Sequence, residues 1–249
     1  MFSIILYSHR DFKHPLHRFC LDTLICNAMK APVTPEIIII SGEKIDNLPK
    51  NVINSAMAKT PGQSSHLDIS RRIISGLMYA KHENCFICEH DVLYPEGYFS
   101  RVHKNPKNAF YYNRNLYVLN EKGFFPSPRM VTSNVYANKK TLKKLYLDRI
   151  AHISGGGRIV WSEPGKNPED PIKNALFYDS KNPVIDTRLA MNFTGPRNAK
   201  NESDYKQSIE YWPYWKRLLL LLTFGGCPEC YQPEKKCICK EKQERKKDK

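Results

Sequence analysis

Short apolar runs alternate with helix-like stretches in the first hundred residues. Three such runs are present, at residues 2–7 (FSIILY), 36–40 (EIIII) and 85–88 (CFIC). Runs without alternation predict strands covered on both faces, as in a parallel sheet flanked by helices. Residues 16–29 and 64–81 favour helices, and Ser65 with Asp68 has capping-box spacing. The order strand, helix, strand, helix, strand predicts an α/β, Rossmann-type fold.

The second half of the chain is less regular. It predicts three further strands and a helix, at residues 109–113, 116–120, 183–186 and 139–149. Residues 152–171 are rich in Gly and Pro and predict a loop. Residues 205–224 favour a helix that Pro213 should start or kink.

Composition and charge narrow the class of protein. With 249 residues and 41% hydrophobic positions, the chain is long enough for one α/β domain and is neither disordered, collagen-like nor a disulfide mini-protein. The 39 Lys and Arg against 25 Asp and Glu give a net charge of +14. Residues 227–249 account for only +3 of this charge. The body of the protein is therefore basic, which indicates a polyanionic partner.

The sequence contains no feature typical of a secreted or membrane protein. The N-terminal apolar run lacks a basic flank and a small-residue cleavage site. The longest aliphatic run, residues 218–222, is far shorter than a membrane span. We expect a cytoplasmic protein without membrane contact, whose eight cysteines are reduced or metal-bound.

The clearest chemical signal is the acidic turn after the third predicted strand. Glu89 and Asp91 flank His90, and ligands of open α/β sheets bind at the carboxyl ends of strands. Two carboxylates at this spacing can reach one hard cation, such as Mg²⁺ or Mn²⁺, that keeps positions open for substrate phosphates. The alternative is a solvated acidic turn that ends a strand.

The wider motif resembles a known enzyme family. Residues 64–99, with EHDVLYP at residues 89–95, resemble GT-A-type glycosyltransferases, and within them the phage and kinetoplastid branch that glycosylates hydroxymethylpyrimidines in DNA. Weaker similarity lies at residues 111–120, 129–142 and 184–197. The resemblance covers roughly residues 1–197 and implies a GT-A-like mixed sheet flanked by helices. The activity that it implies is metal-dependent transfer of a hexose or pentose from a nucleotide-sugar, of the UDP-linked kind, to a 5-hydroxymethylcytosine or 5-hydroxymethyluracil base.

The resemblance also implies roles for individual residues. Asp91 would be the main ligand of Mn²⁺ or Mg²⁺, and Glu89 would assist it directly, through water, or contact the donor sugar instead. The other candidate donor contacts are Tyr7 and Ser8 for the uridine, Ser65 and Arg72 for the diphosphate or the nucleotide, and His90. Two of these have a structural alternative, because an isolated histidine is typical of packing and Arg72 could form a surface ion pair.

The chain departs from the family at one position. Relatives carry a His-Gly pair before the Asn-Phe-Thr-Gly element found here at residues 192–195, whereas this chain has Leu189-Ala190. The metal would then be held by Asp91, Glu89, phosphate and water, or by a substitute side chain. If the enzyme inverts the anomeric centre it also needs a base, and Asp186 and His152 are candidates.

Four cysteines near the C-terminus predict a second metal site. Cys227, Cys230, Cys237 and Cys239 have the C-x-x-C and C-x-C spacing of a tetrahedral, structural Zn²⁺ site. We therefore divide the chain into a GT-A-like domain, residues 1–224, and a zinc knuckle with a basic tail, residues 225–249. Cys85 and Cys88 lie three apart on a strand and should face opposite sides as buried cysteines.

Two further functions stay open at this stage. The first is a glycosyltransferase for a polysaccharide or a small acceptor. The second is a non-catalytic, zinc-containing nucleic-acid-binding protein with a degenerate transferase fold. The aromatic and basic run at residues 211–217 could stack a base, but core packing is the interpretation that we favour.

Overall fold

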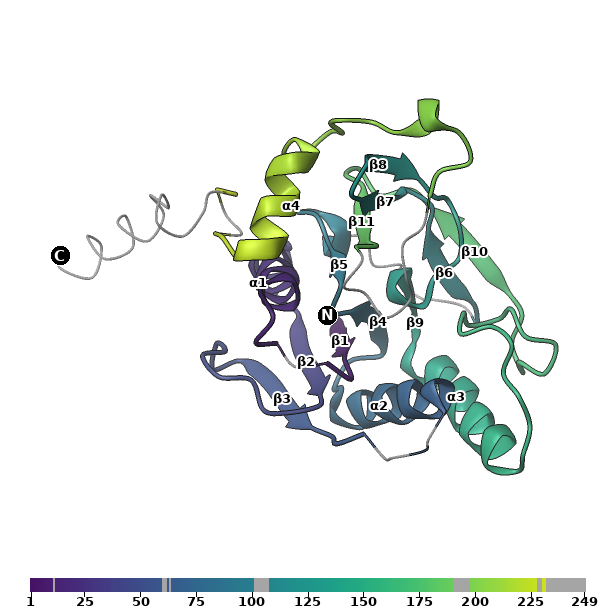
Figure 1. The fold of residues 1–249 in the computed structure, drawn as a ribbon. Coiled ribbons are helices and arrows are strands. Elements are labelled where there is room, and N and C mark those ends of the chain that lie inside the picture. The colour runs from purple at the N-terminus through teal and green to yellow at the C-terminus, as the bar shows by residue number, and fades with distance from the viewer. Residues whose placement is uncertain are drawn as a thin grey trace.

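A mixed seven-stranded sheet forms the centre of the computed structural model (Figure 1). The structure describes residues 1–10, 12–59, 62, 64–100, 108–189, 198–227 and 230–231. In spatial order the strands are β10 (Ala175–Tyr178), β6 (Phe110–Asn113), β9 (Val135–Asn138), β4 (Asn84–Glu89), β1 (Ser3–Tyr7), β2 (Glu36–Ser41) and β3 (Val52–Ala56). The four strands from β4 to β3 are parallel, and β9 is antiparallel to both of its neighbours.

A smaller sheet packs beside the large one. Its four strands are, in order, β5 (Val92–Leu93), β11 (Val184–Thr187), β7 (Leu116–Asn120) and β8 (Gly123–Pro126). The chain passes from the large sheet to the small one between β4 and β5, across His90 and Asp91. The acidic turn predicted from the sequence is therefore the junction of the two sheets.

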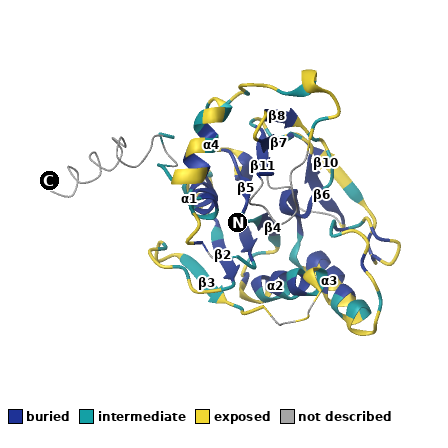
Figure 2. Cartoon of the chain, viewed as in Figure 1, coloured by how far each residue is buried: buried dark blue, intermediate teal, exposed yellow. Residues whose placement is uncertain are grey.

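Helices cover both faces of the large sheet. On one face, α2 (Ser65–Tyr79) and α3 (Lys139–Ser154) share a core with alternate residues of β1 and β2. On the other face, α1 (Pro15–Met29) covers β1 and β2, and α4 (Trp215–Phe224) packs against α1. Figure 2 shows the resulting distribution of burial, with the strands buried and the outer helix surfaces exposed.

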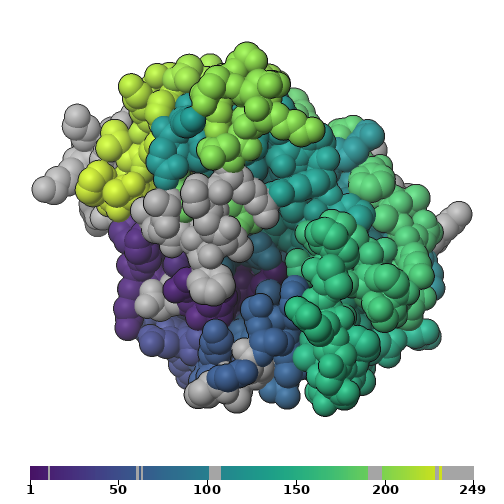
Figure 3. Space-filling model, turned by 45° about the vertical axis from the view of Figure 1, so that its right-hand side comes forward, coloured from purple at the N-terminus to yellow at the C-terminus, as the bar shows by residue number. Residues whose placement is uncertain are grey.

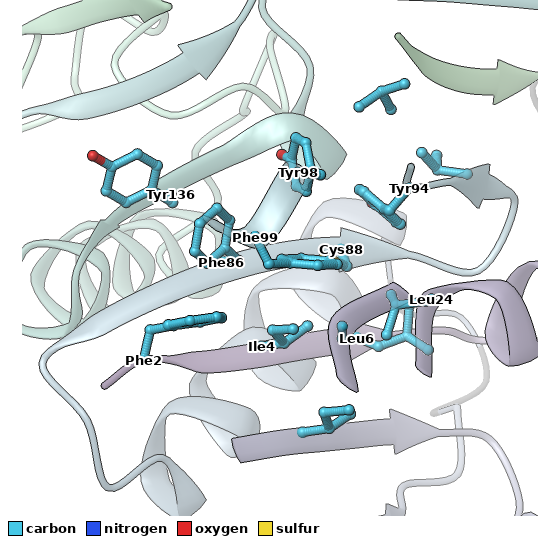
Figure 4. Packing of buried hydrophobic residues seen from close by; sticks show 14 of the residues in the cluster. Phe2, Ile4, Leu6, Leu24, Phe86, Cys88, Tyr94, Tyr98, Phe99 and Tyr136 are labelled. Carbon is cyan, nitrogen blue, oxygen red and sulfur yellow. The ribbon is translucent and has the colours of Figure 1, made fainter. Parts of the chain in front are cut away.

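The core on the α1 face is rich in aromatic residues. Phe2, just before β1, and Ile4 and Leu6 within it share a cluster with residues of α1, while Phe86 and Cys88 are the partners of Ile4 and Leu6 on β4 (Figure 4). The rings of Tyr94, Tyr98, Phe99 and Tyr136 complete the cluster. Cys85 belongs to the core of the opposite face, so the prediction that Cys85 and Cys88 are buried on opposite sides is confirmed.

Most predicted elements are present, and an α/β fold with a mixed sheet is confirmed. The strands at 109–113 and 116–120 exist, but they belong to different sheets. The predicted loop begins too early, because α3 continues through His152 to Ser154. The helix predicted over 205–224 covers only Trp215–Phe224, and its start two residues after Pro213 agrees with the expectation that this proline starts or kinks the helix. Trp212 packs in the core and donates to the carbonyl of Pro183 at 2.7 Å, as the packing interpretation predicts.

One predicted cap is misplaced by a residue. Ser64 rather than Ser65 caps α2, and its hydroxyl accepts a hydrogen bond from Leu67 N at 3.3 Å. Ser65 lies exposed in the first turn. Its side chain is therefore available at the surface, whereas that of Ser64 holds the helix end.

Candidate functional site

The candidate site lies where the carboxyl ends of β1 and β4 meet. The two strands are parallel neighbours, and Tyr7 pairs with Glu89 in register. The segments that follow, which begin at Ser8 and His90, therefore leave the sheet side by side. The N-terminal segment (purple) lies set back between the blue and the green parts of the surface in Figure 3. This is the sheet edge at which α/β proteins bind ligands.

Glu89 is held in place by two tyrosines. The Tyr7 hydroxyl donates to the Glu89 carboxylate, and the Tyr94 hydroxyl accepts from Glu89 N at 3.0 Å while it donates to the Ser133 carbonyl at 2.7 Å. Burial, followed by the charge of Asp91, raises the pKa of Glu89 to about 8. When two carboxyl groups lie close together away from water, ionisation of the second is unfavourable. A bound cation would offset the repulsion between the two negative charges.

Asp91 is fixed through its backbone at the start of the small sheet. Its carbonyl accepts from the backbone nitrogen of Thr187 at 3.1 Å and from the Thr187 hydroxyl at 2.7 Å. The residue is 8% exposed. Strand pairing of β5 with β11 thus positions the Asp91 side chain beside Glu89.

Asp186 joins the two carboxylates from β11, opposite Val92 in register. Its two carboxylate oxygens lie 2.8 Å and 2.9 Å from Arg188 Nε and Nη2, and Arg129 Nη2 lies at 3.4 Å. Burial raises the pKa of Asp186 to about 6, opposed by Arg188. A carboxylate paired in this way is better placed to orient Arg188 than to act as a base. The other candidate base, His152, packs on Gly157 at the end of α3.

Two imidazole rings contact His90 of the acidic turn. His90 contacts His17 of α1 and His9 of the loop after β1, with ring centroids 4.6 Å and 5.6 Å apart. Burial lowers the pKa of His90 to about 4, and burial together with Arg10 lowers that of His9. These two rings are therefore neutral at pH 7. His17 could not be selected from the sequence, because its proximity to His90 depends on how α1 packs.

The remaining predicted donor contacts differ in accessibility. Tyr7 is 4% exposed and Ser8 is buried, with its hydroxyl accepting from Arg10 N at 2.9 Å. Arg72 is fully buried and its Nε donates to Asp68 at 2.9 Å. The alternative of a surface ion pair for Arg72 is therefore wrong, because the pair is inside the protein. Neither Nη atom of Arg72 has a hydrogen-bond partner among the described residues.

The residues present can be compared with what a metal ion requires. In the described ranges, no group of three or more His, Cys, Asp or Glu side chains converges to hold an ion. Glu89 and Asp91 supply two carboxylates, so a hard cation held by them would have to take its other ligands from substrate phosphate and water, which is usual for Mg²⁺.

The zinc prediction falls largely outside the described residues. Cys237 and Cys239 lie outside them, as do Ala190 and residues 192–195. Cys227 and Cys230 are described, and Tyr231 N donates to the Cys227 carbonyl at 2.9 Å in a turn. Tyr231 packs near Trp212 and Phe19, and its carbonyl accepts from Arg217 Nε at 2.9 Å. The start of the cysteine segment is thus attached to α1 and α4.

Comparison with known proteins gives no assignment to a family. No family model and no curated protein matches the sequence. Among solved structures, a nucleotidyl transferase from Methanothermobacter thermautotroptrophicus is similar over 64% of this chain and 84% of its own, with 11% identity and a TM-score of 0.39. The mannosyltransferase PcManGT from Pyrobaculum calidifontis, in complex with GDP-Man and Mn²⁺, is similar over 74% of this chain, with 10% identity and a TM-score of 0.42. This chain spans 56% of the length of that mannosyltransferase.

Both TM-scores lie below 0.5, so neither match assigns an activity to this chain. The structure also bears on the membrane prediction: none of the helices in the described ranges is long and apolar enough to cross a bilayer.

Proposed function

We propose that this protein is a glycosyltransferase that uses a nucleotide-sugar donor, of the UDP-linked kind, with a divalent cation. The observation that carries the proposal is the placement of Glu89 and Asp91 side by side at the carboxyl edge of β4 and β1. Both acids are held by hydrogen bonds to other elements, so their positions do not depend on a flexible loop. The EHDVLYP motif supports the same conclusion from the sequence.

The proposed roles follow from charge and position. Asp91 and Glu89 would hold Mn²⁺ or Mg²⁺, which would neutralise the departing diphosphate. Ser65 is exposed at the positive N-terminal end of α2, where a donor phosphate is favoured. Arg72 has two amino groups available for hydrogen bonds, but it is fully buried. A donor contact with Arg72 therefore requires neighbouring residues to move. Tyr7 acts through Glu89, since its hydroxyl is already bonded to that carboxylate.

The acceptor in this proposal is a 5-hydroxymethylpyrimidine in DNA. It is supported by the sequence resemblance and by the positive charge of the body. An enzyme that modifies a base in a duplex must expose that base, and cations for the backbone assist it. The C-terminal cysteines are proposed as a structural Zn²⁺ site of this enzyme.

The proposal is tested by mass analysis of nucleosides. The purified protein is incubated with Mn²⁺, a panel of UDP-sugars and DNA that contains 5-hydroxymethylcytosine or 5-hydroxymethyluracil. We expect a hexose or pentose mass gain with the native protein and with the control D148N, whose carboxylate is exposed, but none with D91N. Sugar release without modified DNA would leave a transferase with another acceptor. The absence of both activities would contradict the proposal.

A further inference from the structure

Four lysines gather on one side of α3, at the opposite end of the sheet from the acidic turn. Lys139, Lys140, Lys143 and Lys144 lie in the first two turns of the helix, and together with Glu83 they line a shallow hollow of about 440 Å³. Asn138, which caps the helix, pairs with Asn84 at the first residue of β4. Glu89 is at the other end of that strand, about 17 Å away at a strand rise of about 3.4 Å per residue.

These four lysines do not stabilise helix α3. Lys139 and Lys143, and likewise Lys140 and Lys144, are like charges four residues apart, which destabilises a helix. They also place cations at the positive end of the helix dipole, where acidic residues are favoured, and the first turn contains no acidic residue. A sequence that breaks two local preferences in one place indicates a functional requirement there.

Within the described part of the protein one acidic residue lies among these lysines: Glu83 lines the same hollow, and its carboxylate accepts from Asn138 Nδ2 at 3.3 Å. In those ranges, none of the four ammonium groups is in an ion pair, although Lys13, Lys30 and Lys122 are. Lys139 donates to the Ala80 carbonyl at 2.6 Å and so has a structural role. Leu142, Leu145 and Tyr146 bury the opposite side of the helix, so the lysine side faces solvent.

We propose that this lysine side of α3 is a docking surface for the phosphate backbone of a nucleic acid duplex, separate from the candidate active site. Successive lysines one helical turn apart are about 6 Å from each other, a spacing comparable with that of phosphates along a strand. Simple ammonium groups without a pattern of amide or aromatic side chains contact phosphates and do not select a sequence. The surface therefore binds duplexes of any sequence. The inference does not rest on the proposed transferase activity.

The test compares two triple variants that remove the same charge. K140Q/K143Q/K144Q changes the proposed surface and spares Lys139, whereas K44Q/K50Q/K181Q changes exposed lysines elsewhere. Binding to a fluorescent, unmodified 25-base-pair DNA duplex is measured by anisotropy over a series of salt concentrations. Each phosphate contact contributes about 0.9 to the slope of log K against log salt.

For the α3 variant we expect the magnitude of that slope to be smaller by about 2 to 3 than for the native protein, and the affinity for DNA to be at least about tenfold lower. The control variant should change the slope by less than about 1. The thermal midpoint of the α3 variant should be no lower than that of the native protein, since like-charge repulsion is removed. Equal weakening by both variants would show that net charge alone binds DNA, and would overturn the proposal. So would native protein that binds no duplex, or that binds anionic vesicles more tightly than DNA. Donor turnover, if present, should be unchanged in the α3 variant, so failure of the transferase proposal is recognised separately.

Discussion

Glu89 should make the stability of the protein depend on pH in a direction opposite to that of most carboxylates. Its pKa is raised from 4.5 to about 8 in the folded protein by burial and by Asp91. The folded state therefore favours the protonated acid more than the unfolded state does. This contribution is fully present below pH 4.5 and is lost as the pH rises through 8.

The magnitude follows from the same shift. At about 1.4 kcal/mol for each tenfold change, the ceiling is roughly 5 kcal/mol. The side chain retains some solvent contact, so we expect about 1 to 3 kcal/mol. Glu89→Gln keeps the size and an acceptor for the Tyr7 hydroxyl but does not ionise.

The assay is urea unfolding at pH values from 5 to 9, in the presence of a chelator so that no cation binds the carboxylates. The unfolding free energy of the native protein should fall by about 1 to 3 kcal/mol more than that of E89Q across this range. The control E169Q removes an exposed carboxylate and should follow the native protein. Parallel curves for the native protein and E89Q, or a native protein that gains stability relative to E89Q at high pH, would refute this reasoning.

Three further predictions concern packing and buried polar groups, and each is measured by chemical denaturation. Gly76→Ala should cost about 1 to 3 kcal/mol, because a Cβ at Gly76 would lie 2.4 Å from Cγ2 of Ile5; a gain in stability, as helix propensity alone predicts, would contradict this packing. Arg149→Met should cost about 3 to 5 kcal/mol, because it leaves the Asp170 carboxylate buried without its bonds at 2.8 Å and 3.0 Å; a double change to Arg149→Met with Asp170→Leu should recover much of the loss. Trp212→Phe should cost about 1 to 3 kcal/mol, because it removes the indole N–H that donates to the Pro183 carbonyl at 2.7 Å; an unchanged midpoint would disprove that role.

The central strands could be predicted because they are buried on both faces. β1, β2 and β4 are continuous apolar runs, so the amino acids of each strand are enough to predict that it is buried. By contrast, β9 (VYAN) is a four-residue strand whose partners, β4 and β6, lie far away in the sequence. β8 (GFFP) is equally short and pairs with β7, which directly precedes it. No local pattern distinguishes such strands from turns.

The candidate site was predicted in part for the same reason. Glu89 and Asp91 follow a recognisable strand, so their place at its carboxyl end follows from the sequence. The pairing of Asp186 with Arg188 can be predicted from the local sequence, since residues two apart in extended backbone share a face. The contact of His17 with His90 cannot be predicted in this way, because it depends on how α1 packs against the junction of the two sheets. The i, i+4 spacing of Asp68 and Arg72 predicts their ion pair but not its complete burial.

In the proposed mechanism the acidic turn binds a cation and a nucleoside diphosphate together. Calorimetric titration of the protein with UDP, with and without Mn²⁺, measures this, because a cation and a diphosphate that contact each other in one site strengthen each other's binding by the same factor. Mn²⁺ should tighten UDP binding at least about tenfold, and D91N should abolish this coupling while D148N retains it. UDP affinity that is the same with and without Mn²⁺, or coupling that survives in D91N, would contradict joint binding of the cation and the diphosphate at the acidic turn.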